Sequence, residues 1–299
     1  MNNNARLGLR FMLLSALFFS LMNVMARLVP RISAVELAFF RSIVTATLSF
    51  SILRIKGESV WGNRPSLLLL RGLFGTVGLI LYFSTLRAMD LATAVVIQYT
   101  SPLFAALIAW LVLGEKSYRL QWLFLGVCLV GVAMVKGFGE VDTGWFVIGI
   151  VSAMFSGMAY NVIRKLKNTE SPNVILFYFP VVTLPVTLVW FWLRPHDWVM
   201  PVGIEWFYLL LFGLCTQGGQ YFMTRAYQTA AVNQVTAGTY TGVVYSLFFG
   251  WFLFNESVSW MVLAGMALIV TGIILNTRVQ YWMNKRNVPH PETRNVKPM

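Results

Sequence analysis

The chain has 299 residues, of which 58% are hydrophobic and only 11% are charged. A soluble globular domain carries about 25% charged residues, so this composition excludes an ordinary soluble protein and favours an integral membrane protein. The net charge of +12 at pH 7 would suit a nucleic-acid partner, but the basic residues gather between apolar segments. That distribution is typical of membrane topology, so the expected environment is a lipid bilayer and no nucleic-acid partner is expected.

Apolar segments close to 20 residues long recur along the whole chain. A helix of about 20 residues crosses a hydrocarbon core of about 30 Å. The segments lack the alternation of a membrane β-barrel, and backbone groups in lipid must be satisfied internally, so we expect helices. In chain order, the expected spans are 9–29, 34–53, 66–86, 91–113, 120–136, 144–163, 173–193, 204–224, 232–254 and 258–277. The sequence therefore predicts an all-α integral membrane protein with ten transmembrane helices.

Two stretches of the first half return in the second half. Ser15 to Arg27 (SALFFSLMNVMAR) returns as Ser152 to Arg164 (SAMFSGMAYNVIR), and Tyr99 to Glu115 returns as Tyr240 to Glu256. Residues 1–138 and 139–278 are thus expected to form two repeats of five helices each. Because five is an odd number, the second repeat enters the membrane from the opposite side, and the repeats are inverted. The polar, basic tail over 279–299 has nothing to bury and is expected to be disordered.

The distribution of lysine and arginine predicts the orientation. With the N-terminus in the cytoplasm, most basic residues fall in cytoplasmic segments, which places both termini in the cytoplasm. The first span lacks a small-residue cleavage site and is expected to remain as a helix. In this orientation Glu115 faces the cytoplasm and its repeat equivalent Glu256 faces outside.

Arg41 is the residue that is most costly to place, because it lies about two turns into the second span. One hypothesis is that it faces a central cavity and binds an anionic group, or that it holds a neighbouring helix in one transport state. The alternative is a permanent buried ion pair or an anchor satisfied by carbonyl groups. Glu36 lies five residues away, about 140° around the helix, and is not an ideal partner within the helix.

Amide and phenol side chains inside the spans form a second group of candidates. Several converging amides and phenols can hydrogen-bond and stack a small organic molecule. The alternatives are interhelical hydrogen bonds and, for tyrosines near a boundary, an aromatic belt. Tyr99 and Tyr240 occupy equivalent repeat positions and should approach the axis between the halves. The candidate substrate-binding residues are Arg41, Gln98, Tyr99, Tyr160, Asn161, Gln217, Gln220, Tyr221 and Tyr240.

Small residues and prolines predict how the helices pack. Gly72, Gly75 and Gly78 recur at helix-contact spacing, as do Gly149 and Gly157, and close packing is their expected role. The fifth and tenth spans carry similar stripes and could also form the face of a homodimer. Prolines within the spans, which can bend a helix or supply a gate, are Pro102, Pro180 and Pro185.

Motifs for ATP hydrolysis and zinc hydrolysis are absent, since the chain has neither GxxxxGK[ST] nor HExxH. A membrane enzyme acting on lipid-linked substrates would need clustered carboxylates or histidines. Asp90, Asp142 and Asp197 are instead isolated along the chain. We therefore expect no enzyme, no cofactor and no metal. A scaffold without transport activity would tolerate substitution of Arg41 and the interior amides.

The stretches Arg71 to Phe83 (RGLFGTVGLILYF) and Asp90 to Glu115 resemble the EamA family of the drug/metabolite transporter superfamily. The resemblance covers roughly Leu9 to Leu275, and the second repeat departs from it with Val243 in place of proline and Asn255 in place of glycine.

This resemblance implies a secondary transporter of the bacterial inner membrane that moves a small organic metabolite by alternating access through a central cavity. A vitamin-like heterocycle such as riboflavin, S-adenosylmethionine or an amino-acid derivative would suit the aromatic interior. Export of amino acids or toxic compounds is the alternative within the family. Direction, coupling ion and oligomeric state stay open.

Overall fold

The computed structural model describes residues 3–113, 123–124, 126–127, 130–131, 134, 142–166, 169–229, 238 and 241–286. The regular secondary structure of these residues is helical, which confirms the expected all-α class. The helices are α1 (Asn3–Leu28), α2 (Ala34–Ile55), α3 (Pro65–Ala88), α4 (Leu91–Gln98), α5 (Ser101–Leu113), α7 (Thr143–Leu166), α8 (Pro172–Leu193), the short 3₁₀ helix η1 (Pro195–Asp197), α9 (Glu205–Thr229), α11 (Thr241–Phe254) and α12 (Trp260–Arg286).

Five of the described helices are long and apolar enough to cross a membrane, judged by length and composition. These spans are Arg6–Leu28, Ala34–Ile55, Pro65–Ala88, Thr143–Ile163 and Pro172–Leu193. Their bounds lie close to those expected from hydropathy. Most of the expected span 120–136, the beginning of 232–254, and the tail beyond residue 286 lie outside the described residues. The count of ten helices in two inverted repeats therefore stays a prediction.

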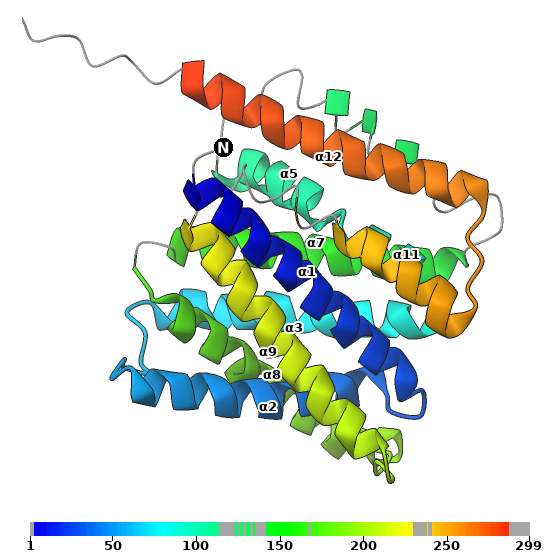
Figure 1. Ribbon diagram of the computed structural model, residues 1–299. Coiled ribbons are helices and arrows are strands. Elements are labelled where there is room, and N and C mark those ends of the chain that lie inside the picture. Colours follow the sequence, from blue (N-terminus) through cyan, green and yellow to red (C-terminus); the bar gives the residue numbers. More distant parts are fainter. Residues whose placement is uncertain are drawn as a thin grey trace, which may run out of the picture.

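Helices from the two sequence halves lie side by side. In Figure 1, α1 crosses the molecule next to α9, and both helices contact each other along their lengths. α1 also contacts α11, and α2 contacts both α8 and α9. α3 packs against α7 and α8, while α12 runs along one edge of the molecule. The polar side chains of the first half are thus positioned by helices of the second half.

The expected span 91–113 is not one helix but two, α4 and α5, which are separated at Tyr99 and Thr100. Pro102 has no backbone N–H and cannot bond the carbonyl of Gln98, so an α-helix cannot continue through this position without a gap. The N–H and the hydroxyl of Thr100 both donate to the carbonyl of Ile97, at 3.0 and 2.6 Å. The bend expected at Pro102 is thus a break between two helices, at which this local turn replaces the missing helical bonds.

Glycines on α3 allow its close contact with α8 and α7, as the sequence predicted. A Cβ atom at Gly75 would lie 2.5 Å from Cε2 of Phe179, and one at Gly78 would lie 3.0 Å from Oγ of Ser156. A real Cβ is not found at the first of these separations, so a side chain at Gly75 would displace the ring of Phe179. The position of Phe179, which matters below, depends on this glycine.

Glu58 ties the loop after α2 to the start of α8. Its carboxylate accepts hydrogen bonds from the Ser171 hydroxyl at 2.6 Å and from the Asn173 amide at 3.0 Å. The hydrogen bond from Ser171 holds the pKa of Glu58 below its ordinary value of 4.5, despite the opposing effect of partial burial. The neighbouring loops are also joined by the backbone N–H of Arg64, which donates to Glu170 at 2.6 Å.

Replacing Glu58 by glutamine is expected to lower the unfolding temperature at neutral pH. Because the folded state lowers the pKa of Glu58, the stabilisation is complete above about pH 4.5 and is lost as the pH falls through the folded-state pKa. Thermal unfolding of the wild type and of Glu58→Gln should thus converge under acidic conditions. A difference in unfolding temperature that stays constant down to pH 3 would contradict the assigned role of the ionised carboxylate.

Candidate functional site

Two arginines meet on one aromatic ring inside the helix bundle. The guanidinium carbon of Arg41 lies 4.7 Å from the centroid of the Phe179 ring, and that of Arg71 lies 4.6 Å from the same centroid. Only 4% of Arg41 and 7% of Arg71 is exposed. Attraction between each cation and the ring face offsets part of the cost of burial. Arg41 and Arg71 are called the arginine pair below.

The arginine pair enters the interior from opposite ends of antiparallel helices. Arg41 is seven residues after the first residue of α2, about 10 Å along the axis at 1.5 Å per residue, and Arg71 is six residues after the first residue of α3, about 9 Å. Since a short loop connects α2 to α3, these starting points lie at opposite ends of the bundle. Contact with one ring therefore places both guanidinium groups well inside.

The carboxylate nearest to Arg41 in sequence has other partners. Glu36 accepts from the backbone N–H groups of Ser33 and Val199, each at 2.8 Å. Ion pairs in the described part of the chain join Arg27 to Glu256 and Arg31 to Glu205. Within this part, the Nε and Nη1 atoms of both Arg41 and Arg71 have no hydrogen-bond partner. A permanent ion pair thus has no described acceptor for Arg41.

Phenol groups lie on α3, on α7 and at the turn between α4 and α5, and one of them is within electrostatic range of the arginine pair. Tyr160 of α7 is close enough to Arg71 for an electrostatic interaction, and its hydroxyl is hydrogen-bonded to Ser101. Tyr82 of α3 is within a similar range of Tyr99 and Tyr160. Tyr160 is 40% exposed, so the group reaches the molecular surface. Among the predicted residues, Arg41 therefore shares the Phe179 ring with Arg71, and Tyr160 lies within electrostatic range of Arg71.

The amides of Gln98 and Asn161 connect α7 to α4 and α5. Gln98 donates to the Ser156 hydroxyl at 2.8 Å and accepts from the Ser152 hydroxyl at 2.9 Å. Asn161 donates to the carbonyl of Ala105 at 2.9 Å, while its buried Oδ1 has no partner among the described residues. Gln98 and Asn161 thus make interhelical hydrogen bonds, which the sequence analysis gave as the alternative to substrate contact. The Oδ1 atom of Asn161 remains an acceptor without a partner among the described residues.

The remaining predicted residues lie on α9, apart from Tyr240, which lies outside the described residues. Gln217 and Tyr221 line a cavity of about 270 Å³, and Gln217 donates to the Ser49 hydroxyl at 3.3 Å. Gln220 is half-buried on the same helix. The cavity, called the Gln217 cavity below, is lined by Ile52, Ile55, Lys56, Asn173, Leu176, Gln217 and Tyr221.

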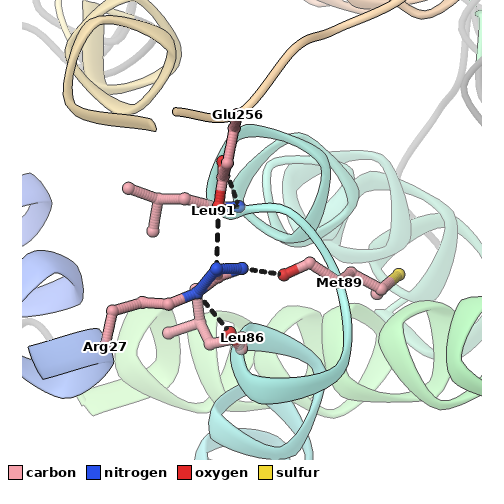
Figure 2. Close-up of polar contacts among 5 residues, drawn as sticks. All are labelled: Arg27, Leu86, Met89, Leu91 and Glu256. Carbon is pink, nitrogen blue, oxygen red and sulfur yellow. Dashed lines mark hydrogen bonds and ion pairs between the residues drawn. The ribbon is translucent and has the colours of Figure 1, made fainter. Parts of the chain in front are cut away.

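An ion pair joins the two sequence halves at the end of α1, and Figure 2 shows it in detail. Nη1 of Arg27 lies 2.7 Å from Oε1 of Glu256. Nε of Arg27 donates to the Leu86 carbonyl at 2.9 Å, and Nη2 donates to the Met89 carbonyl. The backbone N–H of Leu91, at the start of α4, donates to Oε2 of Glu256 at 2.9 Å. The Arg27–Glu256 ion pair is called the latch below.

Local backbone geometry directs Glu256 into the latch. Asn255, which follows α11, has a φ of 52° and is in the left-handed region, which glycine favours and asparagine tolerates. The resulting turn allows the N–H of Glu256 to donate to the Gly250 carbonyl at 3.0 Å. Burial raises the pKa of the Glu256 carboxyl above 4.5, although the Leu91 N–H and Arg27 favour its charged form.

The latch and the Gln217 cavity lie at opposite ends of α2. Arg27 precedes the first residue of α2 by seven positions, whereas Ile52 and Ile55 of the cavity are at the other end of this helix. Sequence reasoning identified neither the latch nor its role. A signal was nevertheless present, because the arginine at position 27 and the glutamate at position 256 each recur in the other repeat, as Arg164 and Glu115.

Apolar helices of membrane-spanning length, packed around buried arginine, amide and phenol groups, define a polytopic helical membrane protein. The model of the EamA-like transporter family matches residues 6–137 and 143–278, so the chain belongs to this family, within the drug/metabolite transporter superfamily. It is a multi-pass membrane transporter and not an enzyme.

Relatives and a solved structure agree with this assignment. The chain is 31% identical over 277 residues to the pseudopaline exporter CntI of Pseudomonas aeruginosa, covering 91% of this chain and 96% of that protein. It is 24% identical to the S-adenosylmethionine uptake transporter of Rickettsia prowazekii, covering 88% and 90% of the two chains. A crystal structure with 18% sequence identity matches with a TM-score of 0.65, covering 93% of this chain and 98% of that one, and it shows the fold alone.

Proposed function

We propose that this chain is a secondary transporter that moves a small organic metabolite by alternating access between two inverted five-helix halves. The observation that carries the proposal is the difference between the ends of α2. At one end the latch holds residues of both sequence halves together, and at the other end the Gln217 cavity lies between α2, α8 and α9. A cavity of about 260 Å³ also lies beside the latch and is lined by Arg27, Arg87, Ala88, Met89, Asp90, Thr93 and Asp142. The proposal therefore rests on the latch as the contact that holds the two halves together at this end, as the closed side of an alternating-access carrier requires.

The proposed orientation follows the distribution of basic residues. With both termini in the cytoplasm of a bacterial cell, the Gln217 cavity faces the cytoplasm and the latch faces outside, in the inner membrane. Breaking the latch would let the outer ends of α1 and α4 separate from the segment after α11. Substrate held in the interior would then gain access to the other side.

The proposed cargo is a small organic metabolite, such as riboflavin, S-adenosylmethionine or an amino-acid derivative. The named relatives include an exporter and an uptake transporter, so both directions remain candidates, and export of amino acids or toxic compounds is the alternative. The proposed contacts are Arg41, Gln98, Tyr99, Tyr160, Asn161, Gln217, Gln220, Tyr221 and Tyr240. The free Oδ1 of Asn161 and the exposed face of Tyr160 support this assignment.

The proposal predicts that a cargo molecule raises the unfolding temperature of the detergent-purified protein. A ligand that binds only the folded state stabilises it by about 2.7 kcal/mol at one hundred times its dissociation constant. Amino acids, nucleosides, riboflavin and S-adenosylmethionine form the panel, and any positive compound is then tested for counterflow in proteoliposomes.

Two alanine variants test whether the cargo binds in the Gln217 cavity. Tyr221→Ala, in the Gln217 cavity, should reduce the thermal shift and the counterflow. Leu188→Ala is the matched control, because Leu188 is 55% exposed on α8 and does not line the Gln217 cavity. If folded protein gave neither binding nor counterflow with any compound of the panel, the proposed cargo class would be wrong.

A further inference from the structure

The arginine pair is a concentration of positive charge that the described interior does not neutralise. Four of its nitrogen atoms, Nε and Nη1 of each residue, have no hydrogen-bond partner among the described residues. The two cations are also close enough to repel each other. A single charged side chain in the hydrocarbon region costs several kcal/mol, and two like charges cost more. We therefore expect the two charges to have a function that offsets the cost of burying them.

Phe179 explains how the arginine pair is held, but it does not replace an anion. The ring faces of phenylalanine attract cations by about 1–2 kcal/mol when the site is desolvated, less than the cost of an unpaired buried guanidinium group. The ring accepts no conventional N–H···O hydrogen bond, so the Nε and Nη1 donors of both guanidinium groups remain available. Gly75 permits this arrangement, because a Cβ there would meet Cδ2 of Phe179 at 2.8 Å and Nη1 of Arg71 at 3.0 Å.

The chemistry of the free donors defines what they bind. A guanidinium group is planar and presents parallel N–H donors that match the two oxygens of a carboxylate. Each group of the arginine pair presents unpartnered donors of this kind, and both contact the same ring, so an oxyanion that binds there meets two positive charges. Tyr160 is near Arg71 and partly exposed, so the rest of a flat organic molecule could extend from the arginine pair towards the phenol groups.

We propose that Arg41 and Arg71, positioned by Phe179, form an anion-recognition site that takes the carboxylate of an organic substrate. This inference rests on the proposed transport function and narrows its cargo to molecules that carry a carboxylate. The arginine pair then recognises the substrate. When the substrate binds, its carboxylate neutralises the positive charge of Arg41 and Arg71.

The first test compares the stability of ligand-free variants by thermal unfolding in detergent. Removing one of two unpaired like charges relieves repulsion, so Arg41→Gln and Arg71→Gln should unfold at the temperature of the wild type or above it. Arg87→Gln is the matched control, since Arg87 donates to the carbonyls of Pro30 at 2.9 Å and Val29 at 3.0 Å, and its loss should lower the unfolding temperature. If Arg41→Gln or Arg71→Gln failed to fold or fell as far as Arg87→Gln, the arginine pair would be a structural anchor and the proposal would be overturned.

The second test measures anion binding without knowledge of the natural cargo. Sodium benzoate is compared with benzamide, its neutral analogue of the same shape, and with sodium phosphate and sodium chloride at equal ionic strength. Benzoate should raise the unfolding temperature of the wild type by about 2 °C or more, and benzamide should not. The shift should vanish in Arg41→Gln and Arg71→Gln and persist in Arg87→Gln. A larger shift with phosphate or chloride than with benzoate would overturn the assignment to a carboxylate.

A transport measurement separates this inference from the proposed function. If a panel compound gave normal counterflow with Arg41→Gln and Arg71→Gln, transport would stand and the anion-recognition site would be refuted. If the wild type bound benzoate through the arginine pair but transported no panel compound, the site would stand and the proposed cargo panel would be wrong.

Discussion

Replacing Arg27 by glutamine is expected to destabilise the folded protein by about 3 kcal/mol, the lower part of the range for breaking a buried ion pair. The Glu256 side chain is only 6% exposed, so the substitution leaves a buried carboxylate whose remaining described donors are the backbone N–H groups of Leu91 and Ala92. The estimate is at the lower part of the range because Arg27 is 20% exposed and solvent screens part of the interaction.

Glu256→Gln should destabilise the protein less than Arg27→Gln, because Arg27 keeps the carbonyls of Leu86 and Met89 as acceptors. Thermal unfolding of both single variants and of the double variant forms a double-mutant cycle. The double variant should lose less stability than the sum of the losses in the two single variants. Arg31→Gln serves as the control, since its ion pair with Glu205 is 3.9 Å long and Arg31 is 55% exposed. If Arg27→Gln were as stable as Arg31→Gln, the stabilising role assigned to the latch would be refuted.

Replacing Gly157 by valine is expected to prevent α5 and α7 from packing and to leave little folded protein. A Cβ atom at Gly157 would lie 2.8 Å from the backbone nitrogen of Ala105 and 3.0 Å from the carbonyl oxygen of Ser101. Backbone atoms cannot rotate away as a flexible side chain can, so the helices must separate. Overpacking of this kind costs about 1–3 kcal/mol or more, and separation also breaks the hydrogen bond from Asn161 to the Ala105 carbonyl.

Gly126→Val is the matched control for the glycine substitution. A Cβ atom at Gly126 meets no atom of the described residues within 4 Å, and the helix propensity cost of valine is the same at both positions. Size-exclusion chromatography should therefore give a monodisperse peak for Gly126→Val and aggregated or absent protein for Gly157→Val. Equal recovery of the two variants would contradict the described contact between α5 and α7.

The sequence predicted the helical class and most span bounds because both depend on local composition. The span 34–53 and helix α2, over Ala34–Ile55, differ by only two residues. Arg41 was recognised as a candidate because a charge in an apolar segment is visible without any contact information. The break at Tyr99 and Thr100 was missed, because Pro102 predicts that helical bonds are lost but does not specify how the chain replaces them.

Contacts between distant helices could not be predicted from one sequence. Arg71 is near the start of its span, where an arginine is compatible with a lipid–water boundary, and its contact with Phe179 depends on how α3 and α8 cross. The latch joins residues 229 positions apart. The substrate-binding role of the predicted amides and phenols stays a prediction.

The contact between α1 and α9 has a consequence for biosynthesis. α1 is the first described helix to leave the ribosome, yet its long contact is with α9, which begins at Glu205. Chains are made at about 5–20 residues per second, so α1 remains in the bilayer for many seconds before this partner exists. During that time its polar groups lack their partners of the folded bundle, since the hydroxyl of Ser15 donates to the Gly219 carbonyl, at 2.8 Å, only once α9 is in place. Closure of the bundle around α1 is therefore a late, post-insertion step of folding.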